Sequence, residues 1–241
     1  GLSPSAALET ATLRALRVLL GLDLDDVALA QIGQRAEVAH AGVNCGILDQ
    51  MASSLLVPGQ MLYLDTRSLE RSLLPLPAEG ELLVLDSGLP HSLADSKYNV
   101  RRAECERAAR LLGVPSLRDA AELERASALP DPFGRRARHV ISENARVSQA
   151  RGASASALGE LMNASHWSLS RDYEVSTAEL DLLVDLLQAD DCVHGAKLTG
   201  AGFGGACVAL CRPGSAAHCA ERVLAAYQAS GQRGRVLVPV Q

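Results

Sequence analysis

The chain has 241 residues, of which 48% are hydrophobic and 21% are charged, a composition that excludes a disordered or fibrous protein. Its net charge of -5 provides no basic excess for nucleic acid or an anionic membrane surface, and no apolar run is long enough to span a membrane. Six cysteines at irregular spacings are expected to be reduced thiols in a cytoplasmic protein, because a chain of this size folds without cross-links.

The first part of the chain changes character after Pro58 and Gly59. Before these residues, apolar side chains recur at three- and four-residue steps, which predicts helices; after them, short runs with strand character begin. The elements expected here are helices over residues 3–20, 25–41 and 46–55 and strands over 61–65 and 81–86. We therefore expect a domain boundary near residue 60, with domains over 1–60 and 61–241.

Helices predominate in the remainder of the chain. The elements expected here are helices over residues 94–112, 135–150, 155–169, 176–188 and 215–227 and strands over 206–211 and 235–240. In the most regular of these helices, Ser176 and Glu179 have the spacing of a capping box. Because helices and strands alternate without a regular βα repeat, we expect an α+β fold with helices on one face of a mixed sheet.

Two groups of side chains, four arginines and a Cys/His group, are expected to have structural roles. Four arginines of the helix over 94–112 are expected to form a solvated face, with the alternative that one of them reaches a substrate phosphate. They are Arg101, Arg102, Arg107 and Arg110. Three cysteines and a histidine near the C-terminus invite a zinc interpretation, but their spacing is not that of a zinc finger, so we expect the thiols to be small buried hydrophobes. They are Cys207, Cys211, His218 and Cys219.

The opening stretch GLSPSAALE has the features of a helix N-terminus. Ser3 suits the N-cap and Pro4 suits the first turn, where a missing N–H has no partner to lose. The outward N–H groups of such a helix end favour a phosphate, and the hydroxyl of Ser5 could bind Mg²⁺. The alternative is that Ser-Pro simply begins a helix.

The stretch AEVAHAGVNCGILDQ places two carboxylates close to glycines. Glu37 lies near the end of a predicted helix, and Asp49 follows Gly42 and Gly46. One carboxylate could hold a metal ion while the other orients or deprotonates a hydroxyl group. Alternatively, each is a solvated surface charge.

The stretch LTGAGFGGACVAL contains a glycine cluster in which Gly200, Gly202 and Gly205 match the pattern G-x-G-x-x-G. A dinucleotide-binding loop requires a helix after the third glycine, but ACVALC has strand character, so the dinucleotide interpretation fails. Two interpretations remain open: the backbone approaches a ligand closely, or the glycines form a tight turn or bulge.

Together these stretches resemble the GHMP kinase family and, within it, the galactokinase group. The likeness covers nearly the whole chain. It is carried by GLSPSAALE, AEVAHAGVNCGILDQ, HSLADSKYNVRRAEC, RRARHVISENARV, LMNASHWSLSRDYEVSTAELD and LTGAGFGGACVAL. The resemblance implies a two-domain GHMP kinase fold, with a truncated N-terminal domain and a ferredoxin-like C-terminal domain.

The resemblance also implies roles for particular residues. Ser5 and Glu37 would hold Mg²⁺, and Asp49 would face the anomeric hydroxyl of the sugar as a base or an electrostatic guide. Gly46 and Tyr98 would contact the sugar. The ATP phosphate-binding residues would be Gly1, Leu2, Ser3 and Ser5, with Gly200, Gly202, Gly204 and Gly205 as a further family motif beside the active site.

The implied reaction transfers the γ-phosphoryl group of ATP to the 1-hydroxyl of galactose, in a cytoplasmic protein that is a monomer when full length. Pro4 replaces a serine of the family loop and removes one N–H from it. The family's upstream segment, with its arginine and Glu-His-Asp cluster, does not precede Gly1 here. We therefore expect a C-terminal part of a longer kinase that is inactive alone and exposes an unpaired sheet edge and apolar surface.

Two alternative functions remain open at this stage. The chain could belong to another GHMP kinase that acts on an N-acetylated sugar or a different small alcohol. It could also belong to a regulatory protein that binds sugar and ATP without transferring phosphate.

Overall fold

The computed structural model describes residues 2–41, 45–90 and 94–239. The chain divides into two compact units, Gly1–Leu76 and Pro77–Gln241. The observed boundary comes after the hairpin of residues 60–75, because Leu62 and Leu64 of that hairpin pack into the core of the first unit. The sequence analysis placed the boundary before the hairpin. Within the described ranges, no helix has the length and apolar character needed to cross a membrane.

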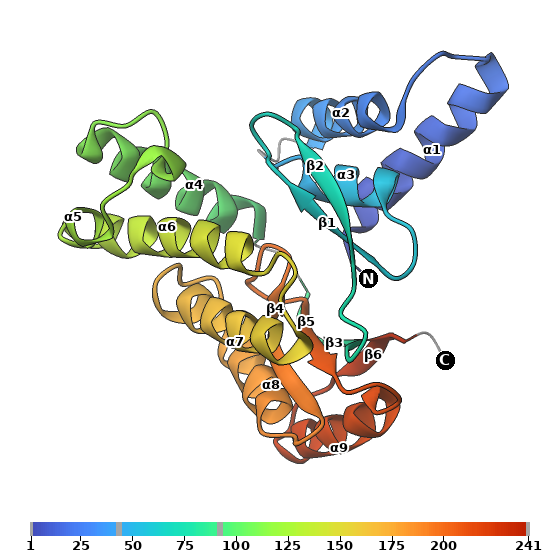
Figure 1. Cartoon of the computed structure of the whole chain (residues 1–241), viewed down its shortest axis with the longest axis vertical. Helices are drawn as coiled ribbons and strands as arrows, with labels where there is room; N and C mark the ends of the chain where they lie inside the picture. Colours follow the sequence, from blue (N-terminus) through green and yellow to red (C-terminus); the bar gives the residue numbers. More distant parts are fainter. Residues whose placement is uncertain (1, 42–44, 91–93, 240–241) are drawn as a thin grey trace. The chain divides into compact units, whose positions relative to one another are not determined.

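The first unit consists of helices followed by a two-stranded hairpin (Figure 1). Its elements are α1 (Pro4–Leu20), α2 (Asp26–Ala36), a π-helix (Glu37–Ala41), α3 (Leu48–Leu55), β1 (Gln60–Leu64) and β2 (Arg71–Pro75). The hairpin is antiparallel, with Leu62 opposite Leu73. The core of the unit is small: Ala30, Ile47 and Met51 are buried in it.

Helix α1 buries little of its apolar surface. Ala6 is buried, but Leu8, Val18, Leu19 and Leu20 are exposed. Single exposed apolar side chains are common on soluble proteins, but Val18, Leu19 and Leu20 are consecutive and all exposed. The expectation of exposed apolar surface in this part of the chain is confirmed.

The second unit contains a four-stranded sheet with the strand order β4-β5-β3-β6. Its strands are β3 (Glu81–Asp86), β4 (Val193–Thr199), β5 (Ala206–Cys211) and β6 (Arg235–Val238). Every neighbouring pair in this sheet is antiparallel, so the expectation of a mixed sheet is wrong. The reason is that β4 and β5 form a hairpin, while each helical connection, β3 to β4 and β5 to β6, joins strands that run in the same direction with one antiparallel strand between them.

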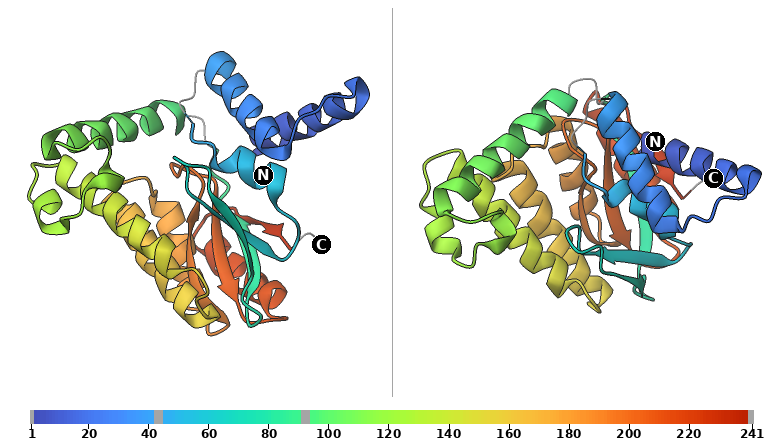
Figure 2. Two further views of the ribbon diagram at one scale, coloured as in Figure 1. Left: turned by 45° about the horizontal axis from the view of Figure 1, so that its top comes forward. Right: turned by 90° about the horizontal axis from the view of Figure 1, so that it is seen from above.

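Three helices pack against this sheet (Figure 2); the first in chain order lies along the β4 edge, where its side chains accept hydrogen bonds from the N–H groups of Ala196 and Leu198, and the other two pack on one face. They are α7 (Ala155–Arg171), α8 (Ala178–Gln188) and α9 (Ala216–Ala229). The shared core includes the fully buried thiols of Cys207, Cys211 and Cys219, so their expected role as small buried hydrophobes is confirmed. All six cysteines lie in the described ranges, and none forms a disulfide.

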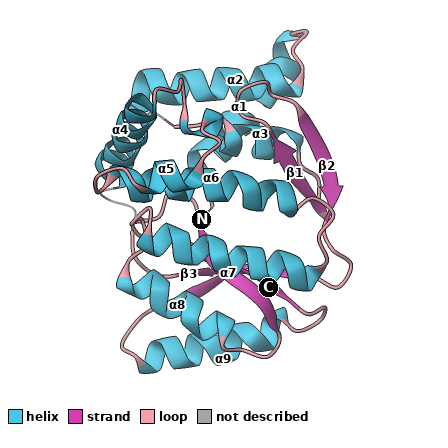
Figure 3. Ribbon diagram, turned by 60° about the vertical axis from the view of Figure 1, so that its left-hand side comes forward, coloured by secondary structure: helices cyan, strands magenta, loops and turns pink. Residues whose placement is uncertain are grey.

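The remaining helices of the second unit form a separate small core. They are α4 (Ala94–Leu112), a 3₁₀ turn (Leu117–Asp119), α5 (Leu123–Ser127) and α6 (Phe133–Gln149). Ala108, Leu112, Ala126 and Ala137 are buried where they meet. Helix α6 also lies beside α7 (Figure 3), so this small core adjoins the sheet layer.

The N-terminus of α8 differs from the predicted capping box. Thr177 is the N-cap residue, and its hydroxyl accepts a 3.3 Å hydrogen bond from the N–H of Leu180. The hydroxyl of Ser176 is buried and has no hydrogen-bond partner among the described residues. The helix therefore begins one residue later than the Ser176–Glu179 spacing predicted.

Candidate active site

Two of the predicted metal ligands meet in the first unit. Ser5 lies in the first turn of α1, and its hydroxyl donates a 2.8 Å hydrogen bond to Oε1 of Glu37. Glu37 is the first residue of the π-helix that continues α2. π-Helical turns are rare in proteins overall, and those that occur are often found at functional sites. The fold thus places two residues that are 32 positions apart within hydrogen-bonding distance.

Gln50 connects this pair to a second carboxylate. The residue is 1% exposed, and its Nε2 donates to Oε2 of Glu37 at 2.6 Å and to Oε2 of Glu9 at 3.2 Å. The sequence analysis missed both Gln50 and Glu9. Glu9 follows Ser5 by one helical turn, so its position on the same helix face could have indicated it. Nothing local indicates that Gln50 is buried.

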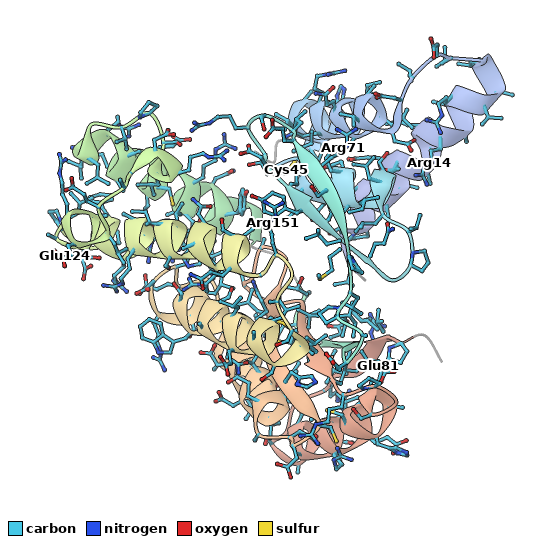
Figure 4. All side chains as sticks on the ribbon, viewed as in Figure 1. Arg14, Cys45, Arg71, Glu81, Glu124 and Arg151 are labelled. Atoms are coloured by element: carbon cyan, nitrogen blue, oxygen red, sulfur yellow. The ribbon has the colours of Figure 1, made fainter. Side chains whose placement is uncertain are left out.

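The cluster concentrates negative charge. Burial raises the pKa of Glu9, and the nearby Glu37 carboxylate raises it further against the opposing effect of the Gln50 hydrogen bond. Burial and Glu37 also raise the pKa of Cys45, labelled in Figure 4, to about 11. These shifts show an environment that disfavours added negative charge and that a bound cation would relieve.

The donor atoms of the cluster fit Mg²⁺. A hydroxyl and a carboxylate are hard oxygen ligands, and Mg²⁺ is usually held by one or two carboxylates together with substrate phosphates and waters. In addition, Oε1 of Gln50 is buried without a hydrogen-bond partner in the described part of the chain. The same amide that holds Glu37 therefore has a free acceptor for a water molecule.

The N-terminus of α1 leaves its first turn uncapped by a side chain. Ser3 is the N-cap residue in the left-handed region, at φ 40°, and its side chain accepts no hydrogen bond from the helix. Pro4 occupies the first turn, as predicted, and Leu2 is exposed. Gly1 lies outside the described residues. The outward N–H groups of this helix end and its positive dipole favour a phosphate group nearby.

Asp49 is exposed on the first turn of α3. The preceding Gly46 is also exposed, and a Cβ atom there would meet no atom within 4 Å. Since successive side chains on a helix point about 100° apart, Asp49 faces solvent while the next residue, Gln50, faces the interior. One short helix thus presents an exposed carboxylate and holds Glu37.

The glycine cluster forms the turn between β4 and β5 in the second unit. Gly202 has φ +78° and is buried, and a Cβ atom there would lie 2.2 Å from the carbonyl oxygen of Val175. The next residue, Phe203, donates its N–H to the same oxygen at 2.7 Å. Gly202 is therefore required for the close approach of this loop to Val175.

The rest of the loop is held by a different support. The N–H of Gly205 donates to the carbonyl of Leu89 at 3.1 Å, and Gly204 is buried beside the same carbonyl. Gly200 has open space around its Cα, with no atom within 4 Å of a Cβ position. The turn interpretation of the cluster is thus confirmed, and Gly200 offers accessible backbone at its start.

Tyr98 lies on α4 in the same unit as the glycine loop and is partly exposed. Its neighbour Lys97 places an ammonium group 5.3 Å from the centroid of the Phe203 ring. A cation at this distance from an aromatic face is attracted to it. Helix α4 therefore connects Tyr98 to the glycine loop.

Comparisons with known proteins agree over most of the chain. Residues 1–55 match the GHMP kinases N terminal domain, and residues 147–229 match GHMP kinases C terminal, which together cover more than half of the chain. A galactokinase of Thermotoga neapolitana is 40% identical over 233 residues, which are 95% of this chain and 66% of that protein. A galactokinase of Homo sapiens is 45% identical over 235 residues, which are 94% of this chain and 60% of that protein.

Solved structures show the same relationship. Lactococcus lactis galactokinase complexed with galactose has a TM-score of 0.90 and 33% identity, over 98% of this chain and 64% of that one. L. major mevalonate kinase shares the fold alone. It is 22% identical, with a TM-score of 0.58, over 92% of this chain and 60% of that one. The chain spans just under two thirds, or less, of the length of these relatives.

Proposed function

Because the chain belongs to the GHMP kinase family, we propose that it is the larger part of a galactokinase, which transfers the γ-phosphoryl group of ATP to the 1-hydroxyl of galactose. The observation that carries the proposal is the cluster of Ser5, Glu37 and Gln50, next to the exposed Asp49. Galactokinases at 40–45% identity support the sugar as substrate, and one relative of known structure holds galactose.

In this proposal the first unit holds the nucleotide's phosphates. Ser5 and Glu37 bind Mg²⁺, which when present neutralises charge on the phosphates. Gln50 keeps the Glu37 carboxylate in place, since its amide donates to that carboxylate at 2.6 Å. The helix end at Leu2 and Ser3 provides N–H groups and a positive dipole, and the glycine loop of the second unit provides further backbone.

Asp49 acts on the acceptor. An exposed carboxylate on a rigid helix turn can accept the proton of a sugar hydroxyl or orient that hydroxyl toward the phosphoryl group. Gly46 leaves room for the sugar beside this helix, and Tyr98 contributes a further contact. Phosphoryl transfer gains most of its rate acceleration from positioning and charge neutralisation. These few groups therefore account for the catalytic contribution that the proposal asks of the protein.

The test is a coupled ADP-release assay with galactose. Since the relatives are longer, the assay uses a polypeptide in which the natural upstream residues precede these 241 residues. We expect this protein to phosphorylate galactose and the 241-residue chain alone to do so poorly or not at all. Asp49→Ala should lower turnover by about 10² to 10⁴ while ATP binding persists. Asp23→Ala, which removes an exposed carboxylate between α1 and α2, is the matched control.

Three outcomes would contradict parts of the proposal. Ordinary turnover by the 241-residue chain would show that its residues suffice for the reaction. Transfer to another small alcohol but not to galactose would overturn the substrate. Unchanged turnover in Asp49→Ala would remove the role assigned to that carboxylate.

A further inference from the structure

The glycine loop Gly200–Gly205 is supported by a segment with an uncommon backbone conformation. The loop packs on the carbonyl of Val175, to which Phe203 donates its N–H. Glu174, directly before this support, has φ +54°, in the left-handed region that non-glycine residues rarely occupy. The backbone turn at Glu174 therefore determines where the carbonyl of Val175 points, and with it the position of the loop.

The side chain of Arg101, on α4, binds main-chain carbonyl groups of this turn. Its Nε donates to the carbonyl of Tyr173 at 2.7 Å, and one terminal nitrogen donates to the carbonyl of Glu174 at 3.1 Å. The same guanidinium lies 5.9 Å from the centroid of the Phe203 ring. Arg101 thus contacts both the support of the glycine loop and the loop itself, and the planar guanidinium fork suits two carbonyls at once.

The position of Arg101 is itself determined by a buried ionic network. The other terminal nitrogen of Arg101 lies 3.1 Å from a carboxylate oxygen of Glu104. Arg136 of α6, which is 1% exposed, donates to that carboxylate at 2.7 Å, to the carbonyl of Asp172 at 2.6 Å and to the carboxylate of Glu174 at 2.6 Å. Two arginines from two helices therefore hold the backbone of residues 172–174.

The placement of Arg101 corrects the sequence analysis, which assigned it to a solvated helix face. The side chain of Arg101 is 16% exposed, whereas that of its neighbour Arg102 is 50% exposed, with its Nε 3.3 Å from the carboxylate of Glu106 on the same helix. The reason is the distant partner segment at residues 173–174, which no local pattern reveals. Arg102 provides a matched control on the same helix.

We propose that Arg101 is a positioning residue of the nucleotide site: it sets the backbone of residues 173–174, and through Val175 it holds the glycine loop in the geometry that ATP requires. The inference rests on the proposed function, since it takes the loop as part of that site. Arg101 donates to the two carbonyls that precede the support of the glycine loop, whereas the residues proposed to contact the sugar are Gly46, Asp49 and Tyr98. Loss of Arg101 should therefore affect ATP more than galactose.

The first experiment measures the loop directly and needs no activity. Amide hydrogen exchange is followed by NMR in the 241-residue chain for the N–H groups of Phe203 and Gly205. In Arg101→Ala, exchange at Phe203 should rise by at least about tenfold, because its acceptor on Val175 is no longer held. Exchange at Gly205, which donates to Leu89, should stay unchanged, and Arg102→Ala should change neither.

The second experiment measures kinetics in the polypeptide with the upstream residues. Arg101→Ala should raise KM for ATP by about tenfold or more, with KM for galactose altered much less, because a small displacement of a binding loop weakens substrate positioning. Arg101→Lys should lie between the wild type and Arg101→Ala, because an ammonium group cannot reproduce the fork. Arg102→Ala should match the wild type.

The outcomes separate this inference from the proposed function. Unchanged exchange at Phe203 in Arg101→Ala would overturn the positioning role, whatever the activity. Faster exchange with an unchanged KM for ATP would show that the loop does not serve the nucleotide. A wild-type protein without ATP-dependent transfer would overturn the proposed function while the exchange result stands. If Arg101→Ala does not fold, Arg101→Lys decides by the same two measurements.

Discussion

Replacing Arg136 by methionine removes a cation from the interior of the second unit while keeping most of the side-chain volume. The guanidinium makes three hydrogen bonds of 2.6–2.7 Å, to two carboxylates and one main-chain carbonyl. It also lowers the pKa of Glu174, because its hydrogen bond favours the charged carboxylate. The substitution would leave all three acceptors without this donor.

The expected loss of unfolding free energy can be worked from these contacts. Removing one partner of a buried ion pair costs roughly 3–5 kcal/mol, because the remaining charge stays desolvated. The Glu104 and Glu174 carboxylates are 19% and 39% exposed, so water can replace part of what they lose. We therefore expect a loss near the lower limit, about 3 kcal/mol.

Urea unfolding provides the assay. Trp167, the only tryptophan in the chain, lies on α7 of the second unit, so its fluorescence reports on that unit, and circular dichroism provides a second probe. The control is Arg102→Met, which breaks an exposed pair with Glu106 and should cost less than about 1 kcal/mol. A loss for Arg136→Met no larger than that of the control would refute the reasoning.

Two further predictions concern a glycine and a histidine. Gly202→Ala should lower the free energy of unfolding by about 3 kcal/mol, because the added Cβ meets the Val175 carbonyl oxygen at 2.2 Å. Gly214→Ala is the control: it has a similar positive φ but lies in open space, so it should lower that free energy by about 1 kcal/mol. Equal losses of the two variants in urea unfolding would show that the contact with Val175 is unimportant. Burial lowers the pKa of His139 from 6.5 to about 4, so its contribution to stability is complete above pH 6.5 and is lost, by up to about 3 kcal/mol, as pH falls toward 4. The wild type should therefore lose more stability than His139→Gln between pH 7 and pH 4.5, and parallel pH profiles would contradict this.

Local patterns predicted most helices and the glycine turn. The helix over 94–112 has the observed bounds of α4, and the helix over 155–169 ends two residues before α7 does. Helical periodicity is a property of neighbouring residues, so a short window of sequence contains it. The pairing of Ser5 with Glu37 was also anticipated, but from the family resemblance and not from any local pattern.

Strand β4 was missed for a physical reason. Its sequence, VHGAKLT, contains a glycine and a lysine, which are uncommon in strands. The lysine, Lys197, is tolerated because the carboxylate of Glu143 on α6 lies 3.8 Å away. Burial lowers the pKa of this lysine, and the carboxylate opposes that shift.

The sequence by itself thus determined the helices, the strand-like runs around the glycines and the positions where a phosphate and a cation could be held. Only the tertiary structure decided that Gln50 bridges two carboxylates, and that Arg101 turns inward to a carbonyl 72 residues away. Helix periodicity and turn chemistry act over a few neighbouring residues. The environment of a charged or amide side chain depends instead on which distant segment packs against it, and that is known only once the chain has folded.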